Sequence, residues 1–145
     1  MNKEKFIGIW TLKSFETRFS DGSIEYPMGK NLIGYIMYHP NDYMSVVIMN
    51  KDRANFNEKF NPIKDFCKTI NSQKKSDAFD TYFSYCGPYE IKNDQLIVHH
   101  LDACSIPDWV GISQDRTYKF SANTLTLSNV STNATALLVW ERIHD

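Results

Sequence analysis

Residues 112–129 read Ile-Ser-Gln-Asp-Arg-Thr-Tyr-Lys-Phe-Ser-Ala-Asn-Thr-Leu-Thr-Leu-Ser-Asn, and alternate residues of the first half share one face. That face carries Ile112, Gln114, Arg116, Tyr118 and Phe120. Polar residues occupy the positions between them, and a period of two is typical of a β-strand with one face towards a core. The short turn Ala122-Asn123 then leads into a second strand, so the stretch predicts an antiparallel hairpin.

The same pattern of short alternating segments separated by turn residues runs along most of the chain. It predicts eight strands, at about residues 8–19, 31–39, 43–50, 81–92, 95–104, 112–121, 124–129 and 135–143. Most links are short enough for hairpins, which makes neighbours in sequence neighbours in space. The sequence therefore predicts one all-β domain over residues 1–145, an eight-stranded antiparallel up-and-down β-barrel closed around a cavity.

Residues 51–80 interrupt the strand pattern between the third and fourth predicted strands. Phe56 and Phe60 lie four residues apart, as do Phe66 and Ile70, which is the spacing of one helix face. We therefore expect one or two short helices in this insertion. They act either as a lid over the barrel mouth or as a plug that stabilises one end.

Composition and charge exclude several classes of partner. Sixteen basic and seventeen acidic residues give a net charge of −1, which offers no attraction to nucleic acid or anionic lipid. The longest apolar run, residues 32–38, is too short to cross a membrane, and the first residues do not show the apolar segment and cleavage site expected of a signal peptide. Three cysteines and four histidines lack ligand spacing, so we expect no metal, and no cofactor motif occurs. The expectation is a cytoplasmic protein whose partner is a small molecule, with its oligomeric state open.

Several short segments, taken together, resemble one known family. They are Gly8-Ile-Trp10, Gly34-Tyr-Ile-Met-Tyr38, Tyr85-Cys-Gly87-Pro-Tyr89, His99-His100, Pro107-Asp-Trp109-Val-Gly111 and Leu138-Val-Trp140-Glu-Arg142. As a set, from about residue 6 to residue 143, they resemble the lipocalin-like domain family of bacteria and fungi. The resemblance implies a barrel whose closed end is plugged by Trp10, with Arg142 of the last strand packed over the indole. It implies no particular activity.

Arg116 is a charged residue on the face of its predicted strand that also carries apolar and aromatic residues. If its face of the strand points inward, the guanidinium is a charge in the interior and requires a partner. Either a carboxylate of the protein or an anionic ligand would serve, because the planar guanidinium suits a carboxylate in both cases. Of these two partners, we favour the carboxylate of the protein. Trp109, in the preceding loop, forms either a pocket wall near Arg116 or a cap over the core.

The facing of two adjacent histidines depends on the turn before them. If Asn93-Asp94 is a two-residue hairpin loop, the register turns His100, Asp102 and Tyr85 inward and leaves His99 outside. A carboxylate near an imidazole is a common arrangement for a general base. The alternative, which we favour, is that these polar side chains only form hydrogen bonds with one another beneath a ligand.

Two hypotheses share this site. The first is a binding protein that holds one small apolar molecule, with a polar or acidic end, inside the barrel. The second is a cofactor-free cyclase, isomerase or dehydratase acting on a polyketide- or fatty-acid-derived substrate, with His100 and Asp102 as the acid–base pair. No catalytic residue follows from the sequence beyond these two candidates. The predicted ligand-binding residues are Tyr38, Tyr85, His100, Asp102, Trp109, Gln114, Arg116 and Tyr118.

Overall fold

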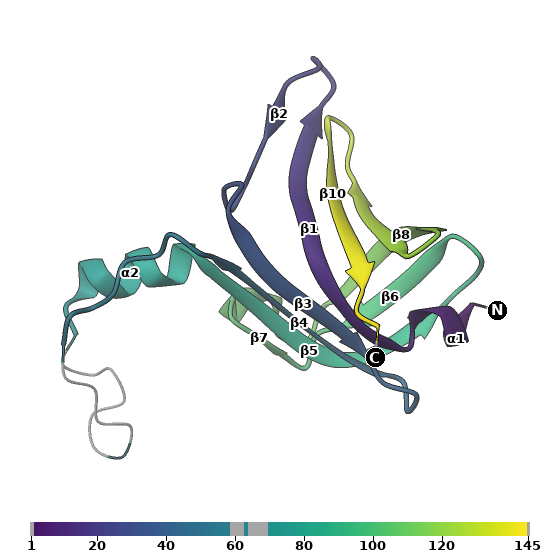
Figure 1. Ribbon diagram of the computed structural model, residues 1–145, viewed down its shortest axis with the longest axis horizontal. Helices are drawn as coiled ribbons and strands as arrows, with labels where there is room; N and C mark the ends of the chain where they lie inside the picture. Colours follow the sequence, from purple (N-terminus) through teal and green to yellow (C-terminus); the bar gives the residue numbers. More distant parts are fainter. Residues whose placement is uncertain (1, 59–62, 64–69, 145) are drawn as a thin grey trace.

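Antiparallel strands wrap into a closed barrel in the computed structural model, which describes residues 2–58, 63 and 70–144 (Figure 1). The strands are β1 (Gly8–Phe19), β2 (Ile24–Glu25), β3 (Leu32–Tyr38), β4 (Tyr43–Asn50), β5 (Tyr82–Ile91), β6 (Leu96–His100), β7 (Ala103–Cys104), β8 (Ser113–Ser121), β9 (Thr124–Val130) and β10 (Ala134–Arg142). The helices are α1 (Lys3–Phe6), α2 (Ser72–Asp80) and the 3₁₀-helix η1 (Pro107–Trp109). No helix in this described part of the chain is long and apolar enough to cross a membrane.

Eight long strands build the barrel wall, and they follow one another in sequence order. Each pairs with the next from β1 through β3, β4, β5, β6, β8 and β9 to β10, and β10 pairs again with β1. That last pairing closes the sheet, and Figure 1 shows β1 and β10 side by side. The short strands β2 and β7 pair with β1 and β5. The predicted eight-stranded antiparallel barrel is therefore confirmed, with the predicted strand at 95–104 divided between β6 and β7.

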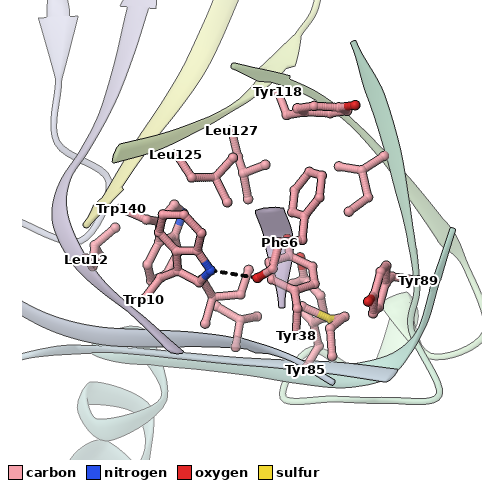
Figure 2. Close-up of a cluster of buried hydrophobic side chains, with 14 of the residues drawn as sticks. Phe6, Trp10, Leu12, Tyr38, Tyr85, Tyr89, Tyr118, Leu125, Leu127 and Trp140 are labelled. Atoms are coloured by element: carbon pink, nitrogen blue, oxygen red, sulfur yellow. Dashed lines mark hydrogen bonds between the residues drawn. The ribbon is translucent and has the colours of Figure 1, made fainter. Parts of the chain in front are cut away.

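Aromatic side chains fill one end of the barrel (Figure 2). We call this cluster the plug, and its aromatic members include Phe6, Trp10, Tyr38, Tyr89 and Tyr118. Phe6, at the end of α1, is fully buried, and its ring centroid lies 5.1 Å from that of Tyr38 and 4.8 Å from that of Tyr118. The indole N–H of Trp10 donates to the carbonyl oxygen of Phe6 at 2.9 Å. The Arg142 guanidinium lies 4.2 Å from the Trp10 ring centroid. Trp10 and Arg142 thus occupy the places that the family resemblance implied.

Gly8 leaves space for the Arg142 guanidinium, which packs over the Trp10 ring. Arg142 donates to the carbonyl oxygen of Ile7 at 2.8 Å and also to that of Lys5, so its guanidinium ties the start of the chain to β10. The backbone of Gly8 has a φ of +131°, and a Cβ at this position would lie 2.8 Å from Arg142 Nη1. Both constraints favour glycine two residues before Trp10.

The insertion at 51–80 contains the helix α2, which lies between β4 and β5. The Asn71 side chain caps this helix by accepting a hydrogen bond from the Lys74 backbone N–H at 2.9 Å. Figure 1 shows α2 and α1 at opposite ends of the barrel. Residues 59–62 and 64–69 are outside the described part of the chain, so the remaining predicted helix stays a prediction, as does its role as lid or plug.

Candidate functional site

The barrel encloses a cavity of about 400 Å³ beyond the aromatic plug. Its wall is mostly apolar and includes Phe15, Met28, Ile36, Ile48, Phe83, Leu127 and Leu138. Phe79 and Asp80 from the last turn of α2 also line it, together with Asn129, and all three are exposed. They therefore mark the mouth of the cavity. A volume in this range suits one small organic molecule.

Arg116 projects from β8 into this cavity and is partly buried. Its Nη1 donates to the Gln114 side-chain oxygen at 2.8 Å and to the Asp115 carbonyl oxygen at 3.1 Å, both neutral acceptors. No described residue forms an ion pair with it. Among the described residues, Arg116 therefore lacks the expected carboxylate partner, and the acidic residue that lines the cavity, Asp80, lies at the exposed mouth.

The side chain of His99, on β6, lies in the barrel interior close to Arg116 of β8. Its side chain is fully buried, with Nε2 at 2.8 Å from the Tyr38 hydroxyl and Nδ1 at 2.7 Å from the Tyr85 hydroxyl. Burial lowers the pKa of His99 to about 3, and the positive charge of Arg116 adds to this effect. Burial also raises the pKa of both tyrosines above the ordinary value. All three side chains are consequently neutral near pH 7.

The hairpin loop before β6 has three residues instead of the predicted two. The backbone N–H of Lys92 donates to the Leu96 carbonyl oxygen at 2.9 Å, which leaves residues 93–95 in the loop. Within it, the Asn93 side chain accepts a hydrogen bond from the Gln95 backbone N–H at 2.8 Å. One added loop residue shifts the register by one and turns every side chain of β6 to the opposite face.

The prediction that His100 faces the lumen is therefore wrong, and His99 takes that place opposite Tyr89. The His100 side chain is 39% exposed, and its Nδ1 lies 2.8 Å from the Ser113 hydroxyl. Asp102 is exposed and lines a groove on the outside of the barrel. The suggested acid–base pair of His100 and Asp102 thus lies outside the cavity.

The other predicted ligand-binding residues divide between the cavity and the plug. Those that line the cavity are Tyr85, Trp109 and Arg116. Gln114 lies beside them as the hydrogen-bond acceptor for Arg116. Tyr38 and Tyr118 are buried in the plug, where the Tyr118 hydroxyl donates to the Asn93 carbonyl oxygen at 2.8 Å. Phe83 was missed, although strand alternation places it on the same face as Tyr85.

The described residues bring no set of potential metal ligands together. Across residues 2–58, 63 and 70–144 there is no group of three or more His, Cys, Asp or Glu side chains placed to hold an ion. Cys86 and Cys104 are free thiols, and Cys67 lies outside the described residues.

The neutral state of His99 makes folding sensitive to acid. Its pKa of about 3 in the folded protein is below the ordinary value of 6.5, so between these values the unfolded chain binds more protons. The contribution of His99 to stability is complete above about pH 6.5 and falls as the pH decreases towards 3, by at most about 1.4 kcal/mol per pH unit. Urea unfolding should show a larger loss between about pH 7.5 and about pH 5 in the wild type than in His99→Gln. Equal losses in the two proteins would contradict a buried neutral imidazole.

Comparison with known proteins places this barrel in a family. The sequence profile of the lipocalin-like domain matches residues 7–143. The chain belongs to the lipocalin-like domain family. No curated protein matches this lipocalin-like chain.

Two solved structures are similar to this lipocalin-like chain. They are the wild-type fluorescent protein UnaG, with 15% identity over 99% of this chain and 100% of that one, and its N57Q mutant, with 13% identity over 98% and 99%. The TM-score is 0.44 in both comparisons.

Proposed function

We propose that this lipocalin-like protein binds one small apolar molecule with an acidic end inside its barrel. The observation that carries this proposal is Arg116, a cation on the cavity wall without an ion-pair partner among the described residues. An unpaired charge away from bulk water is unfavourable. A carboxylate would supply two parallel hydrogen bonds as well as the opposite charge.

The distribution of charge along the cavity favours one orientation of such a ligand. Asp80 is exposed at the mouth, whereas Arg116 lies on the inner wall. Repulsion by the Asp80 carboxylate and attraction by Arg116 both direct an acidic group inward. The apolar body then lies against the surrounding wall and extends towards Phe79 at the mouth.

The enzyme hypothesis receives no comparable support. Its two candidate residues, His100 and Asp102, lie on the outside of the barrel. His99 is inside, but with a pKa of about 3 it is a weak base at neutral pH. The binding function is therefore the one that we propose.

Arg116→Ala should separate ligand binding from folding. We expect the affinity for dansylated undecanoic acid, followed by fluorescence titration, to fall by at least about thirtyfold, because the positively charged partner of the carboxylate is removed. The melting temperature should stay close to that of the wild type, because the substitution leaves no carboxylate of the described protein without its partner.

Arg18→Ala provides the matched control. Arg18 belongs to β1, is 59% exposed and pairs with Glu16 at 2.7 Å outside the cavity. Its removal should change neither probe affinity nor melting temperature by a measurable amount. Unchanged probe affinity in Arg116→Ala would contradict the proposed function.

A further inference from the structure

A chain of three hydrogen-bonding side chains runs from the plug to the cavity wall. Tyr38 of β3, His99 of β6 and Tyr85 of β5 form this relay, with distances of 2.8 Å and 2.7 Å at the two ring nitrogens. A neutral imidazole carries one N–H donor and one acceptor nitrogen. One tyrosine of the relay therefore donates to the ring, and the other accepts from it.

Tyr38 determines the direction of the relay. It is 2% exposed, and within the described chain its hydroxyl has no hydrogen-bond partner other than His99 Nε2. If Tyr38 accepted a proton from Nε2, its own O–H would have no acceptor in the core, which is the costly arrangement. Tyr38 therefore donates to Nε2. The ring proton is then on Nδ1, which donates to the Tyr85 oxygen.

The proton of Tyr85 consequently points away from His99. Tyr85 lines the cavity, whereas Tyr38 does not, and no described side chain or carbonyl accepts from its hydroxyl. The guanidinium of Arg116 lies near this hydroxyl, and its positive charge opposes the effect of burial on the Tyr85 pKa. Two donor groups therefore meet on one part of the cavity wall.

We propose that Tyr85 donates a hydrogen bond into the cavity beside Arg116, and that this pair selects ligands whose polar end is a carboxylate. This inference rests on the proposed function and names the chemistry of the ligand headgroup. A carboxylate accepts from both groups and supplies the charge that Arg116 lacks. An ester offers an oxygen to Tyr85 but no charge to Arg116, and an amine is repelled by the guanidinium.

The tautomer of His99 tests the direction of the relay without a ligand. Long-range ¹H–¹⁵N correlation spectra of the full-length protein, assigned with a His99→Gln spectrum, should show a protonated Nδ1 and an unprotonated Nε2 near pH 7. A protonated Nε2, or a cationic ring at that pH, would overturn the assignment.

Tyr85→Phe tests the hydroxyl itself. Titration with dansylated undecanoic acid should show about a ten- to hundredfold weaker affinity than the wild type, as for the loss of a hydrogen bond to a charged group. The methyl ester of the same probe should bind the wild type weakly, and Tyr85→Phe should change that affinity less. Tyr89→Phe is the control, because Tyr89 lies on the same strand but donates to the His39 carbonyl oxygen outside the cavity.

The combined outcomes distinguish this inference from the proposed function. If the acid binds in an Arg116-dependent way and Tyr85→Phe binds it as tightly as the wild type, the headgroup inference fails and the proposed function stands. If the wild type does not bind the acid, the proposed function fails, and the headgroup inference that rests on it fails with it. A loss of affinity in Tyr89→Phe equal to that in Tyr85→Phe would assign the effect to folding and overturn the inference.

Discussion

Trp10→Ala is expected to lower the free energy of unfolding by about 3–5 kcal/mol, the range for truncation of a buried aromatic side chain. Trp10 is 1% exposed, so the substitution leaves a cavity in the plug. It also removes the hydrogen bond to the Phe6 carbonyl oxygen and the surface on which Arg142 packs. Urea unfolding measured by circular dichroism gives this difference directly.

Trp109→Ala is the matched comparison, because it removes the same side chain from a partly buried position at the cavity wall. Its destabilisation should be clearly smaller than that of Trp10→Ala. Equal losses for the two variants, or a Trp10→Ala protein as stable as the wild type, would show that Trp10 does not close the barrel.

His99→Ala should be the second severe substitution. It removes a fully buried ring and leaves the hydroxyls of Tyr38 and Tyr85 without their partner. We expect a loss of about 2–5 kcal/mol in unfolding free energy, against about 0.5 kcal/mol or less for His100→Ala at the half-exposed neighbouring position.

A rescue experiment separates the two causes of this loss. Adding Tyr38→Phe and Tyr85→Phe to His99→Ala removes the two hydroxyls that have lost their hydrogen-bond partner. Part of the stability should return, because the space left by the His99 ring is then the remaining cause of the loss. If His100→Ala destabilises the protein more than His99→Ala, the register of β6 described above is wrong.

Strand alternation was enough to predict the barrel but not the facing of every strand. On β8 the inward positions of Gln114, Arg116 and Tyr118 follow directly from the period of two. On β6 the same reasoning failed, because the facing depended on a loop length that the Asn93 side chain sets through its bond to Gln95. Helix α1 was not predicted, since four residues are too few to show a helical period.

The site was predicted in part, because alternation gives the face of a residue but not its depth in the barrel. Arg116 and Tyr118 share the inward face of β8, yet only Arg116 lines the cavity. Phe6 fills the space beside Tyr118, with ring centroids 4.8 Å apart, and it comes from α1. A residue contributed by a distant, unpredicted element therefore decides where the plug ends and the cavity begins.

The most direct test of the central claim is a crystal structure of the protein with dodecanoic acid. We expect the carboxylate within about 3 Å of the Arg116 guanidinium, at hydrogen-bonding distance, and the alkyl chain along the apolar wall towards Phe79. An acid bound in the reverse orientation, with its carboxylate at the mouth, or bound only on the outside of the barrel, would contradict the account.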